Sequence, residues 1–241
     1  ARITPKTKAI VLNYPNNPTG AALSREKLDR LAALALQHDL IVITDEIYAE
    51  LTYDGRHKSI ASLPGMRDRT ILLHGFSKAW AMTGFRIGYC CAPRELTHAM
   101  TTIHQYTMLC APTLSQVAAI EALAKPEWDL EEARSRYRLN RNLMCQSFSD
   151  MGLPCHLPQG AFYAFPYIGD LGMTSKDFAL ELLEKEKVAV VPGNAFGPCG
   201  EGFVRCCFAT SREDIKTAME RMAAFVSHTR KTAIPRSETA N

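Results

Sequence analysis

Short, continuous apolar runs recur through the first third of the chain, and each is closed by polar or turn-forming residues. The first runs from Ala9 to Asn13, and the turn-rich stretch from Tyr14 to Gly20 follows it. The runs Leu40 to Thr44 and Thr70 to Leu73 are of the same kind. Strands that lack polar alternation are typical of a parallel sheet covered by helices on both faces. The pattern therefore predicts an α/β fold with a mostly parallel sheet flanked by helices.

Helical periodicity appears between and after these runs. Ser24 stands directly before an amphipathic pattern, and we expect it to cap a helix. The run from Ile87 to Ala92 follows a connection too short for a crossover helix, so we expect an antiparallel strand at the sheet edge. Helical patterns then dominate as far as Gly152, and the stretch from Glu127 to Met151 indicates one long helix.

After Gly152 the predicted elements become shorter. Strand patterns at 161–165, 188–191 and 203–208 alternate with helical patterns from Ser175 to Glu186 and after Ser211. This mixture predicts a smaller α+β domain at the C-terminal end. We expect residues 1–126 to belong to a large domain, 127–152 to form a linking helix and 153–241 to form the small domain. The last dozen residues are polar and aperiodic, as in a frayed tail.

Composition narrows the classes of protein that this chain can belong to. The 241 residues include 28 basic and 25 acidic side chains spread along the chain, so we expect neither a nucleic-acid nor an anionic-membrane partner. No apolar run approaches the roughly 20 residues that span a bilayer, so we expect neither a membrane span nor a signal peptide. The eight cysteines form no C-x-x-C pair, so we expect free thiols, a cytoplasmic location and no metal site.

Three polar residues stand just beyond the predicted strands, where open α/β sheets bind their ligands. They are Asn17, Asp45 and Lys78. Each alone has a structural explanation: Asn17 can shape a turn, Asp45 can cap a helix and Lys78 can be a solvated loop residue. Together they would bring an amide, a carboxylate and an amine into one crevice. A shared ligand accounts for all three.

Four segments resemble motifs of a known family. The run from Gly75 to Gly88 resembles the lysine signature of the fold-type I pyridoxal-phosphate enzymes and, among them, of the class I and II aminotransferases. The segments 16–20, 45–48 and 203–205 resemble three further motifs in the family's order. The resemblance covers residues 1 to about 228, but only the later part of the family's usual chain. It implies a truncated aminotransferase that is weakly active or inactive alone.

The resemblance implies roles for the residues that match. Lys78 would hold pyridoxal phosphate as a Schiff base and then move a proton at the substrate's Cα. Asp45 would pair with the cofactor's ring nitrogen and keep it protonated. Tyr48 and Asn17 would donate hydrogen bonds to the ring's phenolic oxygen.

Further matches concern the phosphate and the substrate. Ser77 and Arg86 resemble groups that bind the cofactor phosphate, although the Ser77 hydroxyl is as readily explained as a cap. Arg205 resembles the residue that clamps the substrate's α-carboxylate, and a structural ion pair is its alternative. The histidines show no pairing and receive no role. Some relatives have a cis Asn-Pro bond, which suggests one at Asn17-Pro18.

The family's activity would be amino-group transfer between an amino acid and a 2-oxo acid, by a homodimer whose neighbouring subunit completes each site. A β-eliminating carbon–sulfur lyase would use the same lysine with a different fate for the carbanion. The effector domain of a transcription regulator is a third possibility, because this fold also occurs joined to a helix-turn-helix module. Which amino acid is the donor stays open at this point.

Overall fold

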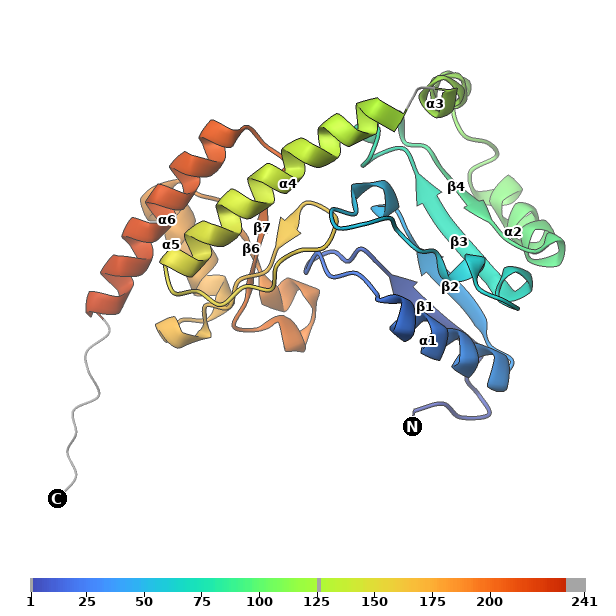
Figure 1. The fold of residues 1–241 in the computed structure, drawn as a ribbon, viewed down its shortest axis with the longest axis horizontal. Helices are drawn as coiled ribbons and strands as arrows, with labels where there is room; N and C mark the ends of the chain where they lie inside the picture. The colour runs from blue at the N-terminus through green and yellow to red at the C-terminus, as the bar shows by residue number, and fades with distance from the viewer. Residues whose placement is uncertain (1, 125–126, 233–241) are drawn as a thin grey trace. The chain divides into compact units, whose positions relative to one another are not determined.

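The computed structural model describes residues 2–124 and 127–232, and the chain divides into two compact units. The first consists mainly of Ala1–Asn17 and Ala21–Ser135, and the second mainly of Arg136–Pro158 and Phe162–Asn241. Figure 1 labels the elements of each unit. The boundary between the units falls inside the long helix α4 (Glu127–Asp150). The predicted domain limits at residues 126 and 152 stay a prediction.

The first unit is built on a four-stranded sheet in the order β1-β2-β3-β4 (Figure 1). Its strands are β1 (Ala9–Asn13), β2 (Ile41–Asp45), β3 (Thr70–Gly75) and β4 (Gly88–Cys91). The first three run parallel, and β4 pairs antiparallel with β3. Both the mostly parallel sheet and its antiparallel edge strand are confirmed.

Helix α1 (Arg25–Gln37) lies against one face of this sheet. The Ser24 side chain accepts a hydrogen bond from the Lys27 amide at 3.3 Å, so Ser24 is the predicted cap. The buried side of the helix packs onto strand and loop residues in one apolar core, whose members are Tyr14, Leu28, Ala32, Ala35, Leu40, Val42, Ile60, Leu63 and Met66. Burial of each large side chain contributes about 1.5–3 kcal/mol.

The other face of the sheet is only partly covered by the described part of the chain. Val11 in β1 is 72% exposed, and all four residues of β4 are exposed. The predicted mostly parallel sheet flanked by helices is confirmed, and the described residues cover these strands only in part. Apolar strand residues indicate that a face needs cover, but they do not identify the segment that supplies it.

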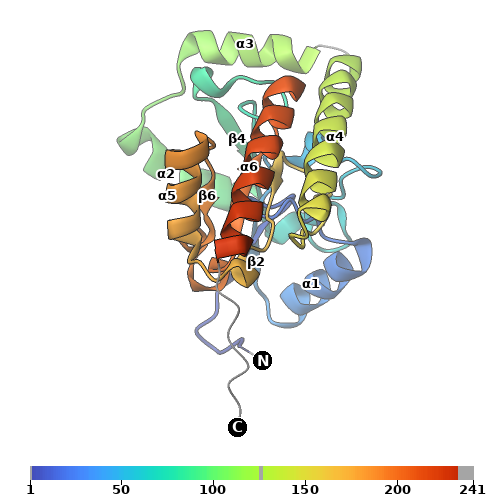
Figure 2. The same cartoon turned by 90° about the vertical axis from the view of Figure 1, so that its left-hand side faces the viewer.

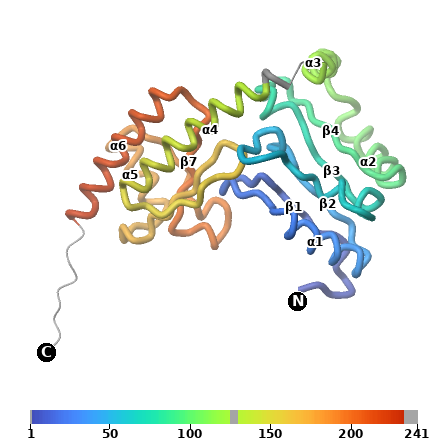
Figure 3. Tube along the Cα trace, viewed as in Figure 1, coloured from blue at the N-terminus to red at the C-terminus, as the bar shows by residue number. Residues whose placement is uncertain are grey.

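The chain leaves β4 into α2 (Arg94–Thr107) and α3 (Thr113–Ala124), both green in Figure 3. α2 buries none of its residues, whereas α3 packs Ala119 and Ala122 against Phe76 and Met82. Phe76 and Met82 flank Lys78 in the sequence. This contact therefore supports the segment that carries the predicted cofactor lysine.

The second unit is a small α+β arrangement, as the sequence predicted. Its sheet has the order β5-β7-β6, with β7 (Val204–Cys207) antiparallel to both β5 (Tyr163–Ala164) and β6 (Val191–Pro192). Helices α5 (Ser175–Glu186) and α6 (Arg212–Thr232) pack together, as Figure 2 shows. Phe178 of α5 meets Phe225 of α6 edge to face, with ring centroids 5.4 Å apart.

Two further expectations concern the whole chain. Within the residues that the structure describes, no helix is long and apolar enough to cross a membrane. All eight cysteines are free thiols, as predicted. The predicted tail falls largely on residues 233–241, which lie outside the described residues.

Candidate active site

The carboxyl ends of the three parallel strands lie in register. Asn13 at the end of β1 pairs with Asp45 at the end of β2, and Asp45 pairs with Leu73 of β3. Asn17 follows Asn13 by four residues, and Lys78 follows the last residue of β3 by three. The segments that carry the predicted amide, carboxylate and amine therefore begin from one edge of the sheet.

The loop after β1 is shaped by its own side chains. The Asn13 Oδ1 atom accepts hydrogen bonds from Asn16 Nδ2 at 3.0 Å and from the Asn17 amide at 3.3 Å. The Tyr14 amide donates to the carbonyl oxygen of Asp45 at 3.2 Å. These contacts fix the approach to Asn17 against the end of β2.

The cis peptide bond in this loop is Tyr14-Pro15, not Asn17-Pro18. The suggestion of a cis bond at Asn17-Pro18 was therefore wrong. Two X-Pro bonds occur within five residues, and the tertiary amide of any X-Pro bond permits the cis form. The sequence pattern does not distinguish between them.

Asp45 ends β2, and Tyr48 lies in the turn that follows it. The Asp45 Oδ1 atom accepts a hydrogen bond from the Ile47 amide at 3.1 Å, and the residue stays partly exposed. Tyr48, at 3% exposure, immediately precedes a short 3₁₀ helix, Ala49–Leu51. The turn thus buries the phenol and leaves the carboxylate partly open.

Two glycines, Gly75 and Gly88, lie close together where β3 ends and the segment that carries Lys78 begins. Gly75 pairs with Gly88 across β3 and β4. A Cβ atom on Gly88 would lie 2.9 Å from the carbonyl oxygen of His74, and one on Gly75 would lie 3.1 Å from the Gly88 Cα atom. Neither distance accommodates a methyl group without a shift of the backbone. The glycines therefore allow β4 to pack tightly beside the residues that lead to Lys78.

The segment around Lys78 is anchored on both sides. Phe76 and Met82 are buried, and the Trp80 Nε1 atom donates to the Ala122 carbonyl oxygen at 3.2 Å. Lys78 and Ser77 are partly exposed between these anchors. The backbone is thus fixed while both polar side chains keep access to solvent.

Left-handed backbone conformations occur close to this lysine. Ala81 has φ = 54° and Arg86 has φ = 51°. Such a conformation costs a residue with a side chain roughly 1–2 kcal/mol, and strain of this kind collects at functional sites. Arg86 is exposed, and its Nη1 atom donates to the Thr83 carbonyl oxygen at 2.8 Å.

Arg205 belongs to the second unit and lies on β7. Its guanidinium carbon is 4.5 Å from the centroid of the Tyr163 ring and 5.1 Å from that of Phe196. A guanidinium over aromatic faces is held in a fixed plane by cation–π attraction. Such a plane is suited to receive a carboxylate at its edge.

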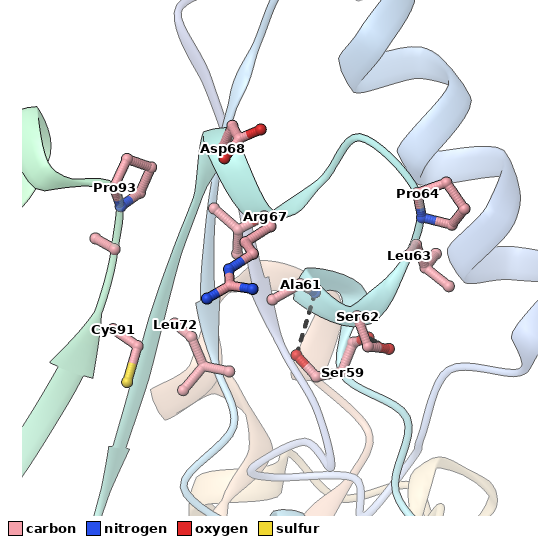
Figure 4. A pocket seen from close by; sticks show the side chains of 12 residues that line it. Ser59, Ala61, Ser62, Leu63, Pro64, Arg67, Asp68, Leu72, Cys91 and Pro93 are labelled. Atoms are coloured by element: carbon pink, nitrogen blue, oxygen red, sulfur yellow. Dashed lines mark hydrogen bonds between the residues drawn. The ribbon is translucent and has the colours of Figure 1, made fainter.

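A separate cavity of about 870 Å³ lies elsewhere on the first unit (Figure 4). Its lining includes Arg67, Thr70 and Leu72, around the amino end of β3. None of the predicted site residues lines it. Because ligands of open α/β sheets bind beyond the carboxyl ends of strands, we do not assign the cofactor to this cavity.

The sequence motifs left one buried acid without a role. Glu46 is 2% exposed, and its Oε2 atom lies 2.6 Å from His57 Nε2. The expectation that the histidines are unpaired was therefore wrong. The signal was present, because Glu46 continues the alternating face of Val42 and Thr44, which is buried. A carboxylate on a buried face requires polar partners.

Comparison with known proteins identifies the family. The model of the family "Aminotransferase class I and II" matches residues 1–222. The chain belongs to this family.

Two relatives and two solved structures illustrate the likeness. The putative aminotransferase YugH of Bacillus subtilis is 54% identical over 229 residues, which cover 95% of this chain and 59% of that protein. Aromatic-amino-acid aminotransferase 2 of Thermococcus litoralis is 46% identical, covering 91% and 57%.

The structure of an aromatic aminotransferase from Pyrococcus horikoshii matches with a TM-score of 0.91 and 46% identity, covering 95% of this chain and 62% of that one. Aspartate aminotransferase from Thermus thermophilus with maleate gives 0.87 and 41%, covering 92% and 58%. This chain of the aminotransferase family thus spans less than two thirds of the length of these proteins.

The donor set at the strand ends fits pyridoxal phosphate. Asp45 offers an anion for a protonated ring nitrogen, Tyr48 and Asn17 offer hydrogen-bond donors for a phenolic oxygen, and Lys78 offers a primary amine. Arg86 offers the planar fork of donors that suits a phosphate dianion. Each polar group of the cofactor therefore has a chemically matched side chain in the first unit.

Proposed function

We propose that this chain contributes the cofactor lysine and one wall of the active site of a pyridoxal-phosphate-dependent aminotransferase. The reaction would transfer an amino group from an amino acid to a 2-oxo acid. The observation that carries the proposal is the register that aligns Asn13, Asp45 and Leu73, because it starts all three functional segments from one edge. Membership of the family supports the reaction class.

Lys78 has two tasks in this proposal. Its Nζ atom holds the cofactor covalently and, once released by the incoming amino acid, carries the proton that leaves the substrate's Cα. The bound cofactor supplies an electron sink for the resulting negative charge. The anchored backbone of Phe76, Trp80 and Met82 keeps the Lys78 amine in place between these tasks.

The other residues bind and orient. Asp45 keeps a proton on the ring nitrogen, since an adjacent anion favours the cationic form of a base. Tyr48 and Asn17 orient the ring through its phenolic oxygen. Ser77 and Arg86 bind the phosphate, and Arg205 binds the substrate's α-carboxylate by a bidentate contact.

Substrates and assembly are proposed from the family. Relatives named aspartate aminotransferase and aromatic-amino-acid aminotransferase support an amino acid as donor and a 2-oxo acid as acceptor. A cytoplasmic homodimer is the assembly that the family resemblance implies. The named relatives support an aminotransferase, and no observation favours the lyase or the transcription regulator.

The proposed function is tested by absorbance of the protein purified from cells and supplied with pyridoxal phosphate. We expect a visible cofactor band, with only slow or partial conversion on addition of an amino acid and return on addition of a 2-oxo acid, because the chain supplies one wall of the site. Lys78→Ala should lose the covalent band, whereas Lys216→Ala, which changes an exposed lysine on α6, should keep it. A band that survives in Lys78→Ala contradicts the assignment.

A further inference from the structure

Glu46 is the centre of a buried polar cluster in the first unit. Its Oε1 atom accepts hydrogen bonds from the hydroxyls of Tyr14 at 3.2 Å, Thr44 at 3.1 Å and Ser59 at 2.9 Å. His57 lies against the other oxygen at 2.6 Å. A carboxylate that is 2% exposed needs such partners, because its desolvation is costly without them.

Tyr14 connects this cluster to the candidate active site. Its hydroxyl shares one proton between Glu46 Oε1 at 3.2 Å and the Lys58 carbonyl oxygen at 3.1 Å, and it accepts a hydrogen bond from the Ile60 amide at 2.9 Å. The Tyr14 ring stacks on His57 with centroids 5.1 Å apart. Burial, and next the Glu46 carboxylate, raise the pKa of Tyr14, so the phenol stays a neutral donor.

The backbone of the same tyrosine touches the residue assigned to the ring nitrogen. The Tyr14 amide donates to the Asp45 carbonyl oxygen at 3.2 Å, and Asn13 Nδ2 lies 3.5 Å from that oxygen. The Asn13 Oδ1 atom in turn accepts a hydrogen bond from the Asn17 amide. One aromatic residue thus joins the buried carboxylate to both segments that would hold the cofactor ring.

We propose that Glu46 is a positioning residue for the cofactor ring. It holds Tyr14, and Tyr14 sets the separation between Asp45 and the loop that ends at Asn17. The inference rests on the proposed function, because Asp45 has a ring nitrogen to align only if the cofactor binds there. A cluster that merely stabilised the core would affect folding and leave the ring nitrogen unchanged.

The test measures the protonation of the ring nitrogen directly. The protein is purified as the cell produces it and loaded with pyridoxal phosphate that carries ¹⁵N in its ring. Nuclear magnetic resonance gives the midpoint pH at which the nitrogen loses its proton. In Glu46→Gln we expect the midpoint to fall by about one pH unit, because a displaced Asp45 favours the cation less. The dissociation constant of the cofactor should rise about tenfold, as expected when a charge-assisted hydrogen bond is lost.

Two further variants keep the inference testable if Glu46→Gln folds poorly. Tyr14→Phe removes only the hydroxyl and should lower the midpoint pH, as Glu46→Gln does. His57→Gln retains a hydrogen-bond donor for Glu46 and should shift the midpoint pH of the ring nitrogen less than Glu46→Gln does. The matched control is Glu132→Gln, an exposed position on α4, which should leave the midpoint unchanged.

The outcomes separate this inference from the proposed function. A Lys78-dependent cofactor signal with an unchanged midpoint in Glu46→Gln and Tyr14→Phe would overturn the inference and leave the function standing. No Lys78-dependent signal in the unsubstituted protein would overturn both.

Discussion

Two glycines of the lysine signature, only four residues apart, are expected to respond in opposite ways to replacement by alanine. At Gly88 the new Cβ atom would lie 2.9 Å from the His74 carbonyl oxygen, which belongs to the neighbouring strand. Because this contact is with backbone, relief requires β3 and β4 to move apart. Forced overpacking of this kind costs typically about 1–3 kcal/mol.

Gly84 is the matched control, since an added Cβ atom there would meet nothing within 4 Å. Alanine at such a position reduces the conformational entropy of the unfolded chain and stabilises by about 0.4–1 kcal/mol. The same gain applies at Gly88, where it offsets part of the cost. We therefore expect Gly88→Ala to lower the free energy of unfolding by about 1–2 kcal/mol and Gly84→Ala to leave it unchanged or raise it.

Urea unfolding of the two variants and the parent, without cofactor, measures both changes. The midpoint concentrations are comparable if the slope of free energy against urea stays constant, which also checks that the unfolding reaction is the same. Equal stabilities for Gly88→Ala and Gly84→Ala would refute the argument that strand separation, rather than glycine replacement in general, determines the cost.

Two further variants test a helix cap and a surface carboxylate. Ser24→Ala removes the acceptor for the Lys27 amide and should lower the free energy of unfolding by about 1 kcal/mol in urea titrations. Ser24→Asp supplies another acceptor and should keep most of the stability of the parent protein. Hydrogen bonds from the Ser175 amide and hydroxyl lower the pKa of Glu201 below its ordinary value of 4.5. The Glu201 carboxylate therefore stabilises the fold above pH 4.5, and this stabilisation is lost as the pH falls through the lower pKa of the folded state. Glu201→Gln should therefore be less stable than the parent at pH 7, and thermal unfolding should show the difference shrinking below about pH 4; a constant difference contradicts this.

Elements set by local sequence were predicted closely. The pattern from Ala9 to Asn13 gave β1, the pattern from Ser175 to Glu186 gave α5, and the short connection before Ile87 gave the antiparallel direction of β4. Each depends on residues adjacent in the chain. Local propensity and connection length therefore suffice for them.

The short strands of the second unit were predicted less well. The pattern at 188–191 predicted a strand, whereas β6 is Val191–Pro192, and the pattern at 161–165 contains only the two-residue β5. Both strands are defined by where they meet β7. That register is a property of the tertiary fold and is not contained in either segment alone.

The candidate site shows the same division. Asp45 ends β2, and Asn17 and Lys78 follow the ends of β1 and β3, so parallel pairing alone was enough to expect them at one edge. The role of Glu46 depends on Ser59 and His57, which are more than ten residues away and come from a segment without regular periodicity. The residues proposed to contact the cofactor could thus be selected from the sequence more readily than the residues proposed to hold them in place.

The proposed function depends most directly on a covalent bond between Lys78 and the cofactor. Borohydride reduction of the protein with bound pyridoxal phosphate, followed by proteolysis and mass spectrometry, locates the bond. We expect the added phosphopyridoxyl mass on the peptide that contains Lys78 and no added mass on the corresponding peptide of Lys78→Ala. The mass on another lysine, or on none while the protein transaminates, would contradict it.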